Sequence, residues 1–525
     1  MSATAASTFP PTPPPSRPSA LSTSRGKLTL ALLCAIGFLD FVDASIVNIA
    51  LPSIQRDLHF SVQNLQWVLS GYLLTYGGFM LLGGRAADLL GRRRVLVAGT
   101  VLFGISSLGG GFAGSAGVLV AARLIQGVGA AFMLPAALSV LTTTFTEGTD
   151  RHKALGAWGA TGGLASAAGV LLGGLLTQGP GWRWVLFVNP PVCVLVLAAV
   201  YRLIPGERPR TERLAFDLTG AVLSCGGTLL LIYALVKAPD QGWGSADTML
   251  ELVGALALLV VFLVNEMRNR NPLVPLSIFR IRGLAATNVT QLIALAGMLS
   301  MFYFVTLYMQ EVLGYSELKA GSAYLPLCFA VGIAAGIASK LFVRTGTRPV
   351  IIVGALISAS GLYLLSRIPV DGTYAPDLLP GMLVLAVGLG GMFVAVATAA
   401  NAGVSQGRAG LAAALLNTSQ QLGGALGLAV LSAIATARTR SLMADHASPS
   451  AALTGGIHRA LLVGAVFLLA AALIGLRAAN TRGETVEQGP EQMDRDEKDR
   501  VEKERDDREG RVQADTGTDP EVVVR

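Results

Sequence analysis

The stretch Gly84-Arg-Ala-Ala-Asp88-Leu-Leu-Gly91-Arg92-Arg93-Arg94 joins two long apolar segments, roughly residues 65–83 and 95–113. Each segment is long enough to cross a bilayer, which needs about 20 apolar residues. The joint itself is too short to form a domain, yet it is dense in glycine and charge. This combination indicates a connection between two membrane helices that move against each other.

The composition also predicts a membrane protein. Of the 525 residues, 52% are hydrophobic and only 14% are charged, whereas soluble domains carry about 25% charged residues. The net charge of +7 does not indicate nucleic-acid binding, because the arginines are scattered between apolar segments. No disulfide or metal site is expected from the four cysteines, which all fall inside predicted spans: Cys34, Cys193, Cys225 and Cys328.

We expect fourteen spans, centred near residues 40, 74, 104, 129, 166, 194, 226, 256, 297, 330, 359, 390, 424 and 467. An even number places both termini on one side, and lysine and arginine mark the cytoplasmic side. The basic residues gather at alternate joints: Arg85, Arg92, Arg93, Arg94, Arg151, Lys153, Arg202, Arg208, Arg210, Arg213, Arg268, Arg270, Arg280, Arg282, Lys340, Arg344, Arg348 and Arg408. The other joints are poorer in them, so both termini are predicted to be cytoplasmic.

The opening stretch matches the signature loop Gly-x-x-x-Asp-x-x-Gly-Arg-Arg/Lys at Gly84, Asp88, Gly91, Arg92 and Arg93. By this motif the chain resembles the major facilitator superfamily. Further blocks, at residues 43–52, 182–189, 307–316 and 417–424, make it similar to the fourteen-span drug:proton antiporter branch. The resemblance implies an all-α membrane protein with the major facilitator fold: two six-helix halves plus two additional central helices, giving 14 transmembrane helices.

A faint internal repeat agrees with two related halves. Residues 339–348 lie where a second signature loop is expected, and Val343 stands in the place of Asp88. The expected organisation is a disordered cytoplasmic tail (1–27), an N-terminal half (28–205), a linker with two extra transmembrane helices (206–282), a C-terminal half (283–479) and a charged cytoplasmic tail (480–525). The last segment alternates acids and bases and is too polar to fold alone.

Two acids lie in the middle of the first span. Asp40 and Asp43 are three residues apart and therefore share one helix face. A charged side chain in the bilayer costs about 3 kcal/mol or more, so such acids are usually functional. We predict proton coupling by this pair; contact with a cationic substrate, or hydrogen bonding to a neighbouring helix, are the alternatives. Asp43 matches the first-helix acid of the family, and Asp40 is an addition to its pattern.

Arg123 matches the fourth-span arginine of the family. It cannot release a proton in practice, but it can pair with a nearby acid, and Gln126 one turn on shares its face. A structural or snorkelling arginine is the alternative. The loop of Asp88, Arg92 and Arg93 is expected to form a conformational charge contact, with a plain basic loop as the alternative.

The fifth span contains the antiporter-motif helix, with Gly169, Gly173 and Gly174 but Val170 in place of the usual proline. The small residues allow close helix approach, and simple helix packing explains them equally well. A substrate pocket needs aromatic and neutral hydrogen-bonding groups, and the candidates are Gln126, Tyr303, Tyr308, Gln310, Asn417, Gln420 and Gln421.

These features predict a proton-coupled exporter of hydrophobic drugs or antibiotics, and the composition suggests self-resistance in a producing bacterium. The alternative is a carrier for another metabolite, such as a sugar, siderophore or amino acid. We expect a monomer in the bacterial cytoplasmic membrane that binds protons and a small hydrophobic or cationic substrate. We expect no enzyme activity and no cofactor, with the proton gradient as energy source, because the chain lacks a nucleotide-binding loop and its histidines lack the spacing of a catalytic site.

Overall fold

The structure is a computed structural model, which describes residues 20–145, 148–205, 217–269, 272, 274, 276–404 and 409–482. The described residues all belong to one compact unit. The expected charged tail from residue 483 and the first 19 residues of the expected N-terminal tail lie outside the described residues. So do five of the basic joint residues used to predict topology: Arg208, Arg210, Arg213, Arg270 and Arg408.

The described residues form helices and no β-strand. The first eight α-helices are α1 (Ser24–Leu58), α2 (Val62–Leu65), α3 (Trp67–Leu90), α4 (Arg92–Gly111), α5 (Ala116–Thr144), α6 (Gly148–Gln178), α7 (Trp184–Phe187) and α8 (Asn189–Leu203). Two more are α9 (Leu218–Gln241) and α10 (Ala246–Arg268). The last seven are α11 (Leu284–Leu307), α12 (Glu317–Ala323), α13 (Leu325–Thr345), α14 (Thr347–Leu365), α15 (Leu379–Ala400), α16 (Ala409–Ala444) and α17 (Pro449–Gly475).

Within the described residues, 11 helical segments are long and apolar enough to cross a membrane. They are α1, α4, α5, α7 with α8, α10, α11, α12 with α13, α14, α15, α16 and α17. Each of the fourteen span centres expected from the sequence falls within a helix, and the remaining three centres lie in α3, α6 and α9. The all-helical membrane fold is therefore confirmed, whereas the count of fourteen transmembrane helices stays a prediction.

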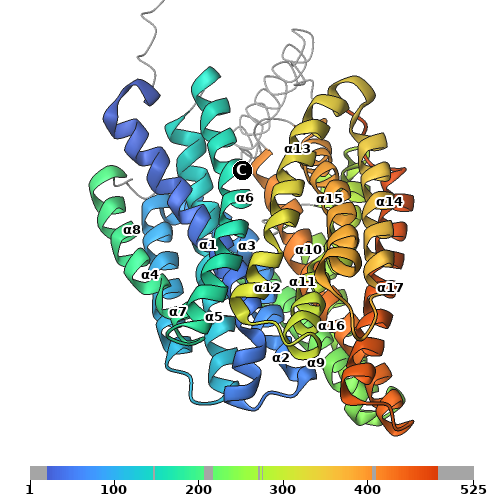
Figure 1. The fold of residues 1–525 in the computed structure, drawn as a ribbon. Coiled ribbons are helices and arrows are strands. Elements are labelled where there is room, and N and C mark those ends of the chain that lie inside the picture. Colours follow the sequence, from blue (N-terminus) through green and yellow to red (C-terminus); the bar gives the residue numbers. More distant parts are fainter. Residues whose placement is uncertain are drawn as a thin grey trace, which may run out of the picture. The chain divides into compact units, whose positions relative to one another are not determined.

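The helix pairing of the first six long helices is repeated by the last six. α3 and α4 both pack on α5, as α13 and α14 both pack on α15, and α1 packs on α6 as α11 packs on α16. Gly91 separates α3 from α4 at φ +95°, and Gly346 separates α13 from α14 at φ +89°. Both backbones are in the region that favours glycine. The two sets of helices lie side by side in Figure 1. The exact boundaries of the halves stay a prediction.

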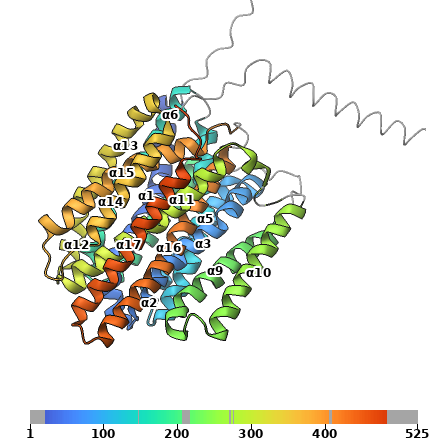
Figure 2. The same cartoon turned by 90° about the vertical axis from the view of Figure 1, so that its right-hand side faces the viewer.

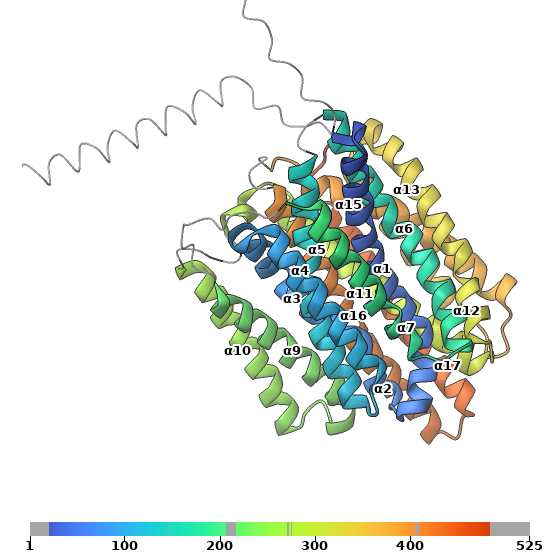
Figure 3. The same cartoon turned by 90° about the vertical axis from the view of Figure 1, so that its left-hand side faces the viewer.

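Helices α9 and α10 pack against each other as a hairpin, and α9 also contacts α3 and α16. Figures 2 and 3 show this hairpin at one side of the other helices, with α10 on the outside. Apolar side chains on α10 are exposed, including Leu250, Val253 and Leu256 at 73%, 62% and 64%. An exposed apolar helix of this length is expected to face lipid.

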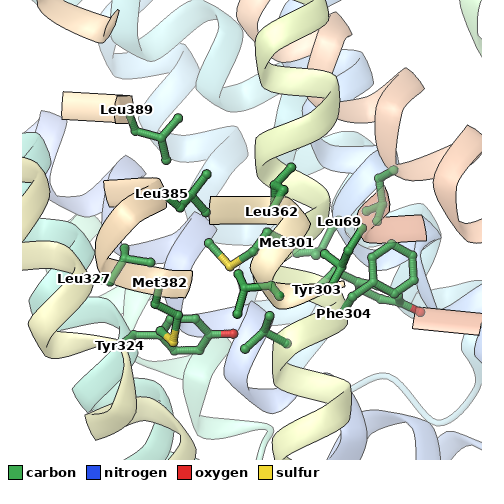
Figure 4. Close-up of a cluster of buried hydrophobic side chains, with 14 of the residues drawn as sticks. Leu69, Met301, Tyr303, Phe304, Tyr324, Leu327, Leu362, Met382, Leu385 and Leu389 are labelled. Carbon is green, nitrogen blue, oxygen red and sulfur yellow. The ribbon is translucent and has the colours of Figure 1, made fainter. Parts of the chain in front are cut away.

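A large apolar cluster fills the space between α11, α13, α14 and α15. Figure 4 shows Met301 and Leu362 pointing toward Met382 and Leu385, with Tyr324 and Leu327 beside them. Leu69 of α3 belongs to the same cluster as Tyr303 and Phe304 of α11. The apolar packing therefore continues from the first set of helices into the last.

Candidate functional site

Asp43 lies in the middle of α1, wholly buried, and is bound from two other helices. Its Oδ2 accepts a 2.6 Å bond from Arg123 Nη1 on α5, and its Oδ1 accepts from Gln126 Nε2 at 2.9 Å. Asn189 Nδ2, at the start of α8, donates to the same Oδ1 at 2.6 Å. Both oxygens of the carboxylate are thus satisfied, as a buried charge requires. The charge joins α1, α5 and α8 at one point.

The guanidinium of Arg123 is held in place by more than the carboxylate. Its side chain is 1% exposed, its Nε donates to Val68 O at 3.0 Å, and its Nη1 also donates to Gln126 Oε1 at 2.8 Å. The ring of Tyr72 lies under the guanidinium, 4.3 Å from ring centroid to Cζ. This cation–π contact adds to the stabilisation of a desolvated arginine.

Asp40 has a separate set of partners on α3. Tyr72 Oη donates to Asp40 Oδ1 at 2.7 Å and Tyr76 Oη donates to Oδ2 at 3.1 Å. The two tyrosines are one helical turn apart, so both hydroxyls reach the same carboxylate. Tyr72 therefore connects the two acids. Its hydroxyl binds Asp40, and its ring face lies against Arg123, the partner of Asp43. Tyr76 also hydrogen bonds to Gln421 of α16.

The sequence prediction that Arg123 pairs with an intramembrane acid matches this geometry, and Gln126 lies in the same network. Asp40 and Asp43 share a face of α1 but are bound by different helices. The sequence analysis missed Tyr72, Tyr76 and Asn189 as members of the site. The spacing of the two tyrosines on an apolar segment was the available signal, since two hydroxyls on one helix face match a nearby carboxylate.

The glycines of the antiporter motif bring α6 against α1 beside Asp43. A Cβ on Gly169 would lie 2.6 Å from Ser45 Cβ, and one on Gly173 would lie 2.8 Å from Ile46 O. These distances are too short for any larger residue without movement of α1. α6 runs as one helix through Val170 from residue 148 to 178, so the missing proline leaves it unbroken.

The signature loop places its glycine and arginines at the junction of two helices. Arg92 begins α4 directly after Gly91. Arg93 Nη2 donates to Tyr201 O at 3.5 Å, and its guanidinium lies 4.7 Å from the centroid of the Tyr201 ring. Arg93 therefore connects this junction to the end of α8. A Cβ on Gly84 would make only ordinary contact, at 3.7 Å from Pro135, and the side chain of Asp88 lies outside the described residues.

The other predicted pocket residues have separate partners. Tyr308 Oη donates to Pro369 O, and Asn417 Nδ2 donates to Ala413 O of its own helix. Gln420 Oε1 accepts from Gln291 at 3.5 Å. Tyr303 lines a cavity that neither aspartate lines. The structure thus does not bring this set together around one space.

Several hydrogen bonds between the first and last sets of helices lie along the second half of α1. Gln310 Nε2 donates to Ile49 O at 2.9 Å. Glu317 Oε1, at the start of α12, accepts from Ser53 Oγ at 2.6 Å and from Arg56 Nη2 at 3.3 Å. A Cβ on Gly174 would lie 2.6 Å from Leu318 Cα. The backbones of α6 and α12 are therefore in direct contact at this end, as Figure 1 also shows.

The sequence pattern of the Major Facilitator Superfamily matches residues 33–428. The chain is 41% identical over 435 residues to the puromycin resistance protein of Streptomyces alboniger, covering 82% of this chain and 86% of that protein. It is 38% identical over 457 residues to the cephamycin export protein of Amycolatopsis lactamdurans, covering 86% and 92%. The tetracenomycin C resistance and export protein of Streptomyces glaucescens is 33% identical over 404 residues, covering 77% and 75%.

Solved structures give the same fold. A D-xylose–proton symporter superposes with a TM-score of 0.61 at 15% identity, covering 88% of this chain and 100% of that one. A peptide transporter in complex with sulfate gives a TM-score of 0.61 at 16% identity, covering 86% and 96%. At such low identity the likeness extends to the fold alone.

Proposed function

The chain belongs to the major facilitator superfamily, and we propose that it exports hydrophobic antibiotics from a bacterial cell in exchange for protons. The observation that carries the proposal is the wholly buried carboxylate of Asp43, bound to Arg123 within the membrane-spanning helices. A charge in that position is expensive and usually functional. The similarity to proteins named for puromycin resistance and cephamycin export supports an antibiotic as the cargo.

We propose that α3, α6 and α9 also cross the membrane, giving fourteen spans with both termini in the cytoplasm. α3 packs on α5 and α6 packs on α1. Because α5 and α1 are long and apolar enough to cross a membrane, this packing supports the proposal for α3 and α6. The basic residues at alternate joints support the orientation. The end of α1 with α2 and α12 then faces the exterior. A monomer suffices, since one chain supplies both sets of helices.

In the proposed cycle, Asp43 alternates between its partner Arg123 and a proton. Arg123 keeps its charge throughout, so protonation of Asp43 removes the attraction that joins α1 to α5. The same event weakens the acceptor for Gln126 and Asn189, and α8 is released from α1. Asp40 assists by exchanging protons next to the site, with Tyr72 as the side chain in contact with both regions.

The contacts between the two sets of helices support an inward-facing state. Residues at the end of α1 bind Glu317 and Gln310, and α6 touches α12. With the proposed orientation these contacts close the exterior. A proton arriving from outside and a substrate arriving from inside must then bind different conformations, and each shifts the population toward the state that it prefers.

Accumulation of puromycin in inverted vesicles tests the proposal. We expect uptake when the vesicle interior is acidified, and loss of uptake when a protonophore collapses the gradient. Empty vesicles from the same strain give the background. Uptake that is unaffected by the protonophore would contradict proton coupling. Gradient-driven uptake of a sugar or an amino acid with none of puromycin would favour a metabolite carrier instead.

A further inference from the structure

A cavity of about 190 Å³ lies between α2, α11, α16 and α17, away from both aspartates. Ser61, in front of α2, is the lining residue from the first set of helices, and the others come from the last set. α2 contacts α16 directly. The cavity is therefore bounded by both sets and changes shape if they move against each other.

One wall of the cavity comes from a single face of α16, and several of its residues carry a polar group. Ser432, Thr436, Thr439 and Arg440 line it, and their spacing places them along one side of the helix. Ser432 is 3% exposed, and its Oγ has no hydrogen-bond partner among the described residues. A buried hydroxyl without a partner is unfavourable, so this atom is suited to a ligand.

The facing wall is apolar. Tyr303, Phe304 and Leu307 of α11 line it together with Leu453 and Ile457 of α17. The rings of Tyr303 and Phe304 meet edge to face, with centroids 5.2 Å apart, and Figure 4 shows the two side chains next to each other. Such a wall suits a flat ring or a short hydrocarbon chain.

We propose that this cavity binds an amphipathic organic anion. Its ring or chain packs on the apolar wall, an oxygen atom accepts from Ser432 Oγ, and its acidic group lies at Arg440. Pockets for drug-sized molecules have volumes of about 300–1,000 Å³, so this smaller cavity suits one fused ring system and only part of a drug-sized molecule. The proposal rests on the proposed function, because the occupant is one class of exported compound, those with an acidic group, at the exterior end of its path.

The test measures binding of 6-hydroxy-2-naphthoate, which has a hydroxyl oxygen and a carboxylate at opposite ends of its ring system, to the purified full-length protein in detergent by calorimetry. We expect binding to weaken at least about tenfold, or about 1.4 kcal/mol, in Arg440→Gln. Arg438→Gln is the matched control, because Arg438 is equally charged and exposed but is not part of the lining. We expect that variant to bind within about twofold of the parent. Equal effects of the two substitutions would overturn the proposal.

A second pair of variants addresses the cavity itself. Ala435→Phe fills the space that Ala435 lines and is expected to abolish binding. Ser432→Ala removes the unpartnered hydroxyl, so it is expected to raise the melting temperature without ligand and to reduce the shift caused by 6-hydroxy-2-naphthoate. If Ala435→Phe does not fold, the melting temperatures of Ser432→Ala with and without ligand test the proposal. An unchanged ligand shift in Ser432→Ala would overturn the proposal.

Two further probes separate the sources of the anion. The 6-hydroxy-2-naphthylmethyl ammonium ion has a similar shape and is expected to bind at least about tenfold more weakly, because its charge is repelled by Arg440. Decanoate represents a fatty acid from the bilayer, and tighter binding of decanoate than of 6-hydroxy-2-naphthoate would overturn the assignment to exported compounds. The binding measurement needs no proton gradient, whereas puromycin uptake does. Absence of probe binding in a protein that still takes up puromycin would therefore contradict this inference alone. Intact binding without gradient-driven uptake contradicts the proposed function instead.

Discussion

Asp43 and Arg123 form a fully buried ion pair, with 2.6 Å between Oδ2 and Nη1 and exposed fractions of 0% and 1%. An ion pair this far from water gains little net stability, since desolvation of both charges offsets their attraction. Removing one partner is costly, because the other charge is left buried. A site of this kind is stable while both charges are present and changes its contacts when a proton neutralises the acid.

We expect Asp43→Asn to abolish gradient-driven uptake of puromycin in inverted vesicles, because the amide cannot carry a proton. The variant leaves Arg123 without a counter-ion, so the free energy of unfolding is expected to fall by about 3–5 kcal/mol. Adding Arg123→Gln to Asp43→Asn removes the unpaired charge and is expected to restore part of the melting temperature without restoring uptake. Full uptake by Asp43→Asn would transfer the proton role to Asp40 or another acid.

Asp40 is expected to affect coupling and not substrate binding. Asp40→Asn keeps an acceptor oxygen for one tyrosine of α3 but loses the exchangeable proton. We expect gradient-driven uptake to fall at least about tenfold, which corresponds to about 1.4 kcal/mol, while exchange of puromycin against internal puromycin stays near the parent rate. Both are measured in the same vesicle preparation. Equal loss of both activities would mean that Asp40 acts on the substrate.

The hydroxyls of Tyr72 and Tyr76 serve as a matched pair. Both bind Asp40, but Tyr76 also hydrogen bonds to Gln421 across the two sets of helices. A hydrogen bond to a charged group contributes about 1.5–3 kcal/mol, so both Phe substitutions are expected to lower stability by a similar amount. We expect Tyr76→Phe to slow transport more than Tyr72→Phe. The same transport rate in both variants would exclude a role for the bond to Gln421.

The sequence predicted the long helices and named both members of the buried ion pair, but it did not say which acid pairs with Arg123. Long apolar segments leave helix as the only structure that satisfies the backbone in lipid, and an acid and an arginine in such segments must find partners. The tyrosines on Asp40 were missed, because an aromatic residue in an apolar segment is usually part of the core. The separate partners of Tyr308 and Asn417 were missed for another reason. Neutral polar side chains can form hydrogen bonds with nearby backbone groups, and the sequence does not indicate which group accepts.

The contact of α6 with α12 predicts a way to open the exterior side. A Cβ at Gly174 would lie 2.6 Å from Leu318 Cα and 2.8 Å from Glu317 O, so Gly174→Ala is expected to separate the two helices. In a cysteine-free background, labelling of Thr306→Cys by a membrane-impermeant maleimide from outside is expected to become several-fold faster. Gly162→Ala on the same helix is the control, because its nearest neighbour is 3.6 Å away. Equal labelling in both would mean that this contact does not close the exterior.

The two glycines between consecutive helices, Gly91 and Gly346, predict an order of stability among alanine variants. Gly91 and Gly346 have φ of +95° and +89°, and an L-residue held in such a sparsely populated backbone region costs about 1–3 kcal/mol. A Cβ on Gly346 would also meet Asn480 Oδ1, so Gly346→Ala is expected to lower the melting temperature more than Gly91→Ala. Gly109→Ala in α4 is the control, since nothing lies within 4 Å of its Cβ. There alanine is expected to stabilise the helix by up to about 1 kcal/mol. Thermal unfolding in detergent, followed by circular dichroism, gives the order of the melting temperatures. A Gly91→Ala protein as stable as Gly109→Ala would show that the junction between α3 and α4 tolerates a side chain.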